Sequence, residues 1–209
     1  QKKCMDNLKE INYGQAIYEG CYQEMEKDDS VFVYGLGVDD QKGHYGTSKD
    51  LHKVFGEKRS FDMPLSEDAM TGVGIGAALA GLRPIYVHQR MDFLLLCMNQ
   101  LVNMAAKLRY MSSGEHSVPF VVRAAIGRSW GQGAQHSQAF HSYFMHVPGI
   151  KVVAPTTPHD AKGCLIASIR DNNPVIFVEH RMLYSNTGYV PEKLYEVEFG
   201  KGRVLIEGT

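Results

Sequence analysis

The sequence predicts an α/β fold with a mostly parallel sheet that helices cover on both faces. Short, continuous apolar segments recur along the chain, a pattern typical of strands that are buried on both sides. Segments with helical spacing of apolar residues separate them, and this alternation favours a parallel sheet. The length of 209 residues, with 44% hydrophobic and 22% charged residues, suits one globular domain.

The N-terminal part of the chain predicts a helix, a strand and a second helix. Apolar side chains recur at helical spacing over residues 12–27. The apolar run at 31–34, closed by Gly35, predicts a buried strand. A polar loop extends from there to Thr47, and a short helix is expected up to about Phe55.

A helix of small residues is predicted over 72–81, with Glu67 just before its N-terminal end. Glycine recurs in it, although a glycine costs about 1 kcal/mol relative to alanine inside a helix. Small residues allow another backbone or a flat ligand to come close. Two interpretations of Glu67 remain open. Its carboxyl is sheltered from water and handles a proton, or it merely favours the helix N-terminus through the dipole.

The rest of the chain continues the alternation. A strand at 84–88 precedes a long helix from Phe93 through Leu108, apolar on most faces. We expect that helix to be buried on more than one side, and therefore to form a subunit interface. The later elements are strands at 118–124, 150–154 and 174–178, a helical segment at 136–145 and a helix from Pro158 through Ile169.

Charge and cysteine content limit the function classes. A formal net charge of -1 gives no broad electrostatic case for binding nucleic acid or an anionic membrane, and the apolar runs are too short to span a bilayer. The scattered cysteines indicate neither a zinc site nor a disulfide framework. Without a signal-peptide pattern at the start, we expect a cytoplasmic protein, or one of the mitochondrial or another organellar matrix in a eukaryote.

A serine hydrolase is the rival enzyme. Gly127-Arg128-Ser129-Trp130-Gly131 matches the nucleophile-elbow pattern and follows a predicted strand. Asp160 or Asp171 with His180 could complete a triad in the right chain order. Against this, glycines follow Ser129 where a helix should begin, and no oxyanion-hole HGGG segment precedes it. Ser129 is therefore kept as the less favoured nucleophile.

Histidines cluster at His136, His141 and His146. The spacing of the first two does not suit a helical zinc pair. A single histidine beside a ligand, acting as a donor or proton carrier, is more plausible. The alternative is a set of polar surface or interface histidines.

Six motifs occur in order along nearly the whole chain. They are Asp62-Met63-Pro64-Leu65-Ser66-Glu67, residues 76–84, Asn103-Met104-Ala105-Ala106-Lys107, residues 131–138, Asp160-Ala161-Lys162-Gly163 and residues 170–175. In this order they resemble the beta subunits of the thiamin diphosphate-dependent 2-oxo acid dehydrogenases, a family that includes the pyruvate, branched-chain and acetoin enzymes. The resemblance implies a transketolase-like pyrimidine-binding domain over residues 1–185. Residues 186–209 would be a tail or linker toward a C-terminal domain absent from this chain.

The resemblance also implies site residues. In the family, the glutamate at the Glu67 position hydrogen-bonds a ring nitrogen of the cofactor's aminopyrimidine and helps to activate it. Phe93 stands where an aromatic ring stacks on that pyrimidine, with Gln89 nearby. His136 matches a histidine that faces the substrate or the acyl-carrying lipoyl group. A potassium or other monovalent cation would bind the backbone carbonyls of Phe120, Ser168, Asp171 and Asn173.

Partners follow from the same resemblance. No Gly-Asp-Gly followed by Asn, the magnesium-diphosphate motif, occurs in the sequence, so an alpha subunit would hold that end of the cofactor in an alpha-two beta-two assembly. Beta–beta contacts and the lipoyl domain of an acyltransferase are further expected partners. One departure is Leu36-Gly37, where the family carries an acidic pair thought to relay protons. A catalytically inactive structural or regulatory partner with this fold is therefore the main alternative.

Overall fold

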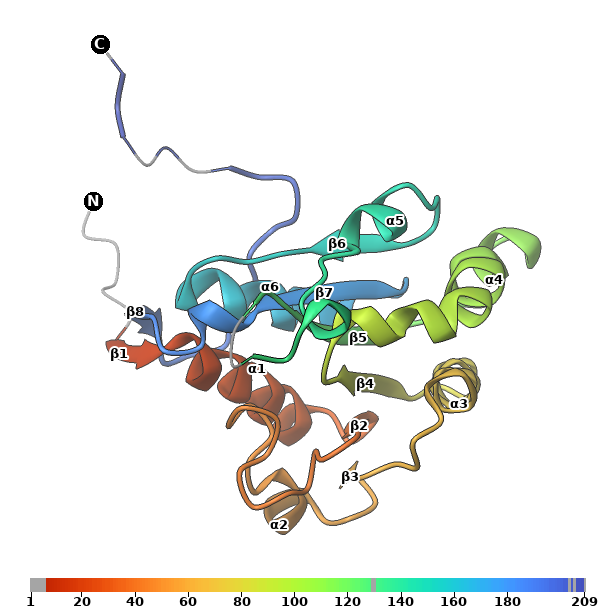
Figure 1. Ribbon diagram of the computed structural model, residues 1–209, viewed down its shortest axis with the longest axis horizontal. Helices are drawn as coiled ribbons and strands as arrows, with labels where there is room; N and C mark the ends of the chain where they lie inside the picture. The colour runs from red at the N-terminus through yellow and green to blue at the C-terminus, as the bar shows by residue number, and fades with distance from the viewer. Residues whose placement is uncertain (1–6, 129–130, 203, 205, 209) are drawn as a thin grey trace.

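A parallel sheet lies at the centre of the computed structural model (Figure 1), which describes residues 7–128, 131–202, 204 and 206–208. Within the described residues the sheet has six strands, and every neighbouring pair is parallel. In spatial order the strands are β3 (Ser60–Phe61), β2 (Val31–Gly35), β4 (Arg83–His88), β5 (Val121–Ile126), β7 (Val175–His180) and β6 (Lys151–Val153). The predicted parallel architecture is confirmed.

Helices cover both faces of this sheet, as predicted. One core packs α1 and α6 against strand residues such as Val33 and Ile85. The other packs α3 and the segment after β4 against their strand neighbours Tyr34 and Tyr86. The helices are α1 (Tyr13–Lys27), α2 (Leu51–Phe55), α3 (Glu67–Leu79), η1 (Met91–Cys97), η2 (Asn99–Ala105), α4 (Ala106–Met111), η3 (Ala134–His136), α5 (His141–Met145), α6 (Pro158–Arg170) and η4 (Arg181–Leu183).

A small antiparallel sheet joins the two ends of the domain. It pairs β1 (Leu8–Asn12) with β8 (Thr187–Pro191), and the sequence analysis predicted neither strand. Asn12 ends β1 and also caps α1, because its side chain accepts a hydrogen bond from the Gln15 amide while the Gln15 side chain accepts one from the Asn12 amide. This reciprocal cap explains why the helix begins at Tyr13.

The segment from Phe93 to Leu108 is not one α-helix. It is a 3₁₀-helix, η1, followed by a π-helix, η2, and then by α4. Apolar side chains on it, such as Leu96 and Met104, are exposed in this chain, as are Val73 and Leu79 of α3. These exposed apolar side chains fit the expectation that this side of the molecule contacts another subunit. Among the described residues, no helix is long and apolar enough to cross a bilayer.

Other boundaries differ as well. Helix α3 begins at Glu67 rather than at residue 72. Strand β5 begins at Val121 rather than at 118, which fits Pro119, since proline cannot donate to a sheet ladder. The segment 136–145 contains only the end of η3 and the short α5.

Gly74 shows why α3 uses small residues. A Cβ at Gly74 would collide with the Tyr34 hydroxyl and lie 2.7 Å from Cε2 of Phe120, whereas Gly76 has open space around it. We expect Gly74→Ala to lower the free energy of unfolding by about 1–3 kcal/mol through overpacking. Gly76→Ala, the matched control, should raise it by about 0.5–1 kcal/mol. Denaturant unfolding of both variants tests this, and equal effects would contradict it.

Candidate active site

A pocket of about 480 Å³ lies beside the carboxyl ends of β2, β4 and β5. Ligands of open parallel sheets bind at this edge, because the loops that follow the strands meet there. All four residues that the resemblance assigned to catalysis or to cofactor binding line this one pocket. They are Glu67, Gln89, Phe93 and His136.

Glu67 opens α3 and reaches the pocket from the helix N-terminus. Its side chain is half-buried, so the shelter expected for it is incomplete within this chain. Among the described residues, none donates a hydrogen bond to its carboxylate, while its backbone carbonyl accepts one from the Thr71 hydroxyl at 2.7 Å. The carboxylate is therefore available to a ligand in the pocket.

Phe93 and His136 form one wall. Their ring centroids lie 5.2 Å apart with the planes at 71°, an edge-on arrangement. Gln89 Nε2 donates to the Leu36 carbonyl at 3.1 Å, which ties the loop after β4 to the loop after β2. Leu36 itself lines the pocket. The pocket is thus apolar at Leu36, where the resemblance implies an acidic residue.

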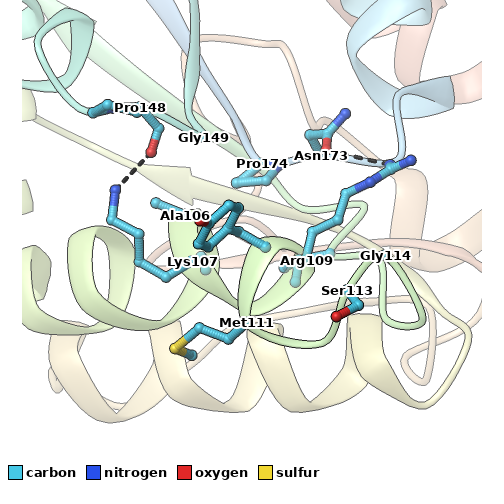
Figure 2. A pocket seen from close by; sticks show the side chains of 13 residues that line it. Ala106, Lys107, Arg109, Met111, Ser113, Gly114, Pro148, Gly149, Asn173 and Pro174 are labelled. Atoms are coloured by element: carbon cyan, nitrogen blue, oxygen red, sulfur yellow. Dashed lines mark hydrogen bonds between the residues drawn. The ribbon is translucent and has the colours of Figure 1, made fainter.

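A larger cavity along α4 fits the expected chemistry less well. A cavity of about 1020 Å³ runs along α4 (Figure 2), where Lys107 Nζ donates to the Pro148 carbonyl at 2.7 Å and Arg109 Nη1 to Asn173 Oδ1 at 3.4 Å. None of the described residues that line it carries a carboxylate or an imidazole, so they offer no side chain to exchange a proton near neutral pH. The pocket around Glu67 is the candidate active site.

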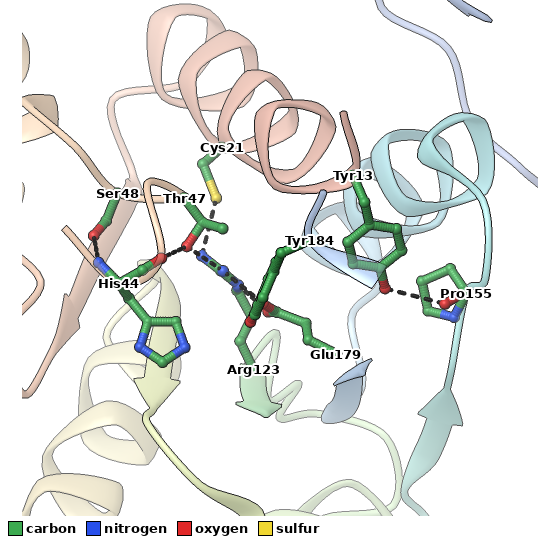
Figure 3. Close-up of polar contacts among 9 residues, drawn as sticks. All are labelled: Tyr13, Cys21, His44, Thr47, Ser48, Arg123, Pro155, Glu179 and Tyr184. Carbon is green, nitrogen blue, oxygen red and sulfur yellow. Dashed lines mark hydrogen bonds and ion pairs between the residues drawn. The ribbon is translucent and has the colours of Figure 1, made fainter. Parts of the chain in front are cut away.

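A buried polar network supports the rim of that pocket (Figure 3). Arg123, which is fully buried, donates to the two carboxylate oxygens of Glu179 at 2.5 and 3.0 Å and to the Thr47 hydroxyl at 2.7 Å. The Tyr184 hydroxyl donates to Glu179 at 2.7 Å. The Tyr184 ring stacks on Tyr45, which lines the pocket. Residues distant in the sequence thus hold the loop after β2 against β5 and β7.

Two buried histidines are held neutral, and one of them, His88, lines the pocket. Burial lowers the pKa of His44 to about 4 and that of His88 to about 3. In the unfolded chain a histidine takes up its proton near pH 6.5. These two histidines should therefore not lower the free energy of unfolding above about pH 6.5. As the pH falls from there toward 4 and then 3, the unfolded chain binds protons that the folded chain does not, and the free energy of unfolding should decrease.

NMR titration of the histidine rings tests this. Neither His44 nor His88 should gain a proton in the native protein above about pH 5. The free energy of unfolding should decline over the same range in which the unfolded histidines are protonated. A native ring at either position that titrates near its ordinary pKa would contradict the assignment.

Two of the carbonyls expected to bind a cation already accept hydrogen bonds within the chain. The Phe120 carbonyl accepts the Val175 amide at 2.9 Å, and the Asp171 carbonyl accepts Arg83 Nη1 at 3.3 Å. Each carbonyl has a second lone pair, so ligation remains compatible with these contacts. Among the described residues, no group of three histidine, cysteine, aspartate or glutamate side chains could hold a metal ion. The site at Phe120, Ser168, Asp171 and Asn173 stays a prediction.

The hydrolase alternative finds little support in the described residues. Ser129 lies outside them. The two candidate acids make other contacts: Asp160 Oδ1 lies 3.1 Å from His159 Nδ1, and the Asp171 carboxylate pairs with Lys151. His180 Nδ1 accepts the Met182 amide at 3.3 Å.

Comparison with protein families decides the classification. Residues 9–187 match the family of the transketolase pyrimidine-binding domain. The chain belongs to this family. The fold agrees, since a split-gene transketolase described as an inactive beta4 tetramer superposes with a TM-score of 0.72 at 18% identity, over 95% of this chain and 59% of that one.

Curated relatives of this pyrimidine-binding domain bear out the resemblance seen in the motifs. The pyruvate dehydrogenase E1 component subunit beta of Porphyra purpurea is 46% identical over 92% of this chain and 58% of its own length. The acetoin:2,6-dichlorophenolindophenol oxidoreductase subunit beta of Cupriavidus necator is 45% identical (92% and 60%). The 2-oxoisovalerate dehydrogenase subunit beta of Bacillus subtilis is 43% identical (95% and 61%). The chain spans about 60% of the length of these relatives.

Proposed function

We propose that this chain is the pyrimidine-binding part of the beta subunit of a thiamin diphosphate-dependent 2-oxo acid dehydrogenase. The observation that carries the proposal is the meeting of Glu67, Gln89, Phe93 and His136 in one pocket of a chain whose relatives are beta subunits of such enzymes. The reaction would be oxidative decarboxylation with acyl transfer to a lipoyl domain. It would take place in the cytoplasm or an organellar matrix.

The pocket suits the aminopyrimidine end of the cofactor. A pocket of about 480 Å³ has room for the ring beside Phe93, and the Glu67 carboxylate has no donor among the described residues to compete for it. When bound, thiamin diphosphate supplies the electron sink for decarboxylation. Glu67 would share a proton between its carboxylate oxygen and a ring nitrogen, and closure by a partner would strengthen that hydrogen bond by excluding water.

Phe93 and His136 would have separate roles. The Phe93 ring offers an apolar face on which the pyrimidine can pack. His136 lies against Phe93 and lines the same pocket, so its imidazole can give or take a proton beside the reacting groups. Gln89, fixed to the Leu36 carbonyl, would hold the floor of the pocket in place.

An alpha subunit would complete the site. The sequence lacks the Gly-Asp-Gly and Asn motif, so the diphosphate and its magnesium would be held by the partner. The exposed apolar side chains of α3 and the η1–η2 segment, together with the open space around Gly72 and Gly76, support a close contact there. Beta–beta association and potassium at the carbonyls near Asp171 belong to the same proposal.

Reconstitution tests the proposed function. The complete beta subunit would be combined with an alpha subunit that carries the diphosphate motif, and carbon dioxide release from a 2-oxo acid would be followed. Release should require both subunits, thiamin diphosphate and magnesium. A stable assembly without turnover would instead favour a structural or regulatory partner, an alternative supported by Leu36 in the pocket wall.

A further inference from the structure

Arg90 is a buried cation in the wall of the candidate active site. It follows Gln89 at the carboxyl end of β4, and only 3% of its surface is exposed. It lines the same pocket as Glu67 and His136. Nothing in the proposed function so far uses this side chain.

The chain satisfies the Arg90 guanidinium only in part. Nη2 donates to the Gly127 carbonyl at 2.5 Å. Among the described residues, Nε and Nη1 have no hydrogen-bond acceptor. Asp92 Oδ2 lies 4.0 Å from Nε, close enough for charge attraction but too far for a hydrogen bond. Buried N–H groups in native proteins nearly always have a partner, so these two nitrogens can take an acceptor from a group bound in the pocket that Arg90 lines.

The charges around Arg90 favour an anion as that acceptor. Arg181, which is 4% exposed, donates Nη1 to Gln132 Oε1 at 2.6 Å, and Gln132 lines the pocket. Burial and the nearby charge of Arg181 together lower the pKa of Arg90. Asp92 offsets part of this positive charge. Its Oδ1 accepts two hydrogen bonds from Gln138, at 3.1 and 2.9 Å, while its Oδ2, the oxygen nearest Arg90, has no hydrogen-bond donor among the described residues.

We propose that Arg90 recognises a negatively charged group, a carboxylate or a phosphate, at the far end of the substrate. This inference rests on the proposed function for the 2-oxo acid itself. The charged group is a second one, which stays on the acyl portion when the carboxyl beside the oxo group leaves. Carboxylate and phosphate oxygens form the strongest hydrogen bonds with a guanidinium. A neutral acyl chain would leave the Arg90 nitrogens without acceptors, so the pocket selects against it.

Binding to the full chain tests the inference by calorimetry at constant ionic strength. The probes are glutarate, methyl phosphate and the neutral isostere glutaramide. We expect glutarate or methyl phosphate to bind the wild type at least tenfold more tightly than Arg90→Gln, and the anion that binds identifies the charged group. Arg109→Gln removes the same charge from the other cavity and should bind like the wild type. Arg90→Lys keeps the charge and guards against a folding defect.

Two results would overturn the inference. One is a wild-type chain that binds neither anion, and the other is a folded Arg90→Gln that binds them equally well. These outcomes are separate from the proposed function, which fails if reconstituted subunits show no thiamin diphosphate-dependent turnover. If the assembly turns over but the chain binds neither anion, the role of Arg90 is rejected and the proposed function is retained.

Discussion

Replacing Glu67 with glutamine is expected to reduce thiamin diphosphate-dependent turnover of the assembled enzyme by about 10²–10⁴-fold, the usual contribution of a positioned proton-transfer group. Glutamine keeps the size of the side chain but cannot share a proton with a pyrimidine nitrogen. Steady-state turnover at saturating cofactor measures the effect. Thermal unfolding should show that the fold is retained, because Glu67 is only half-buried.

Asp68→Asn provides the matched control. Asp68 is exposed and shares the first turn of α3 with Glu67, so this variant removes the same charge from the helix N-terminus. If the role of Glu67 is only to favour the helix dipole, both variants should lose about 0.3–1 kcal/mol of stability and little activity. Near-normal turnover of Glu67→Gln would reject the proton-sharing role.

Replacing Arg123 with methionine is expected to lower the free energy of unfolding by about 3–5 kcal/mol, because it leaves the Glu179 carboxylate buried without its partner. Both side chains are at most 1% exposed. Denaturant unfolding at neutral pH measures the loss. The double variant Arg123→Met with Glu179→Met should be less destabilised than the single one, since replacing a whole buried pair by apolar residues is often nearly neutral. A single variant as stable as the wild type would contradict the account.

The same pair predicts a dependence on pH. Burial alone would raise the pKa of Glu179, but the Arg123 guanidinium and its hydrogen bonds hold that pKa below its ordinary value. The stability from this pair is therefore present above the unfolded pKa of about 4.3. It should be lost as the pH falls through the lower folded pKa, and this acid-sensitive part should be missing in Arg123→Met.

Most of the fold could be predicted because the spacing of apolar residues along the sequence indicates the strands and helices. Continuous apolar strands at Val31–Gly35 and Val175–His180, separated by helices with periodic apolar residues, permit few architectures other than a parallel sheet covered on both faces. Glu67 and His136 could be proposed because each stands in a motif, and Gln89 and Phe93 because of their place between two of the motifs. That they meet in one pocket follows from the topology, since the loops after parallel strands converge at one edge.

The features missed by sequence analysis depend on contacts between distant residues. Strand β1 forms because it pairs with β8, far away in the sequence. The buried pair of Arg123 and Glu179 lies within apolar strands. The sequence shows that each residue is charged but not that the two form an ion pair. Arg90 follows a strand like any loop arginine, and only its burial and its missing acceptors single it out.

The most direct test of the account is an experimental structure of the complete beta subunit assembled with its alpha subunit and thiamin diphosphate. We predict that the aminopyrimidine lies in the pocket beside Phe93, with a ring nitrogen within hydrogen-bonding distance of the Glu67 carboxylate. The diphosphate should be bound by the alpha subunit. A cofactor bound away from this pocket, or a pyrimidine without contact to Glu67, would contradict the central claim.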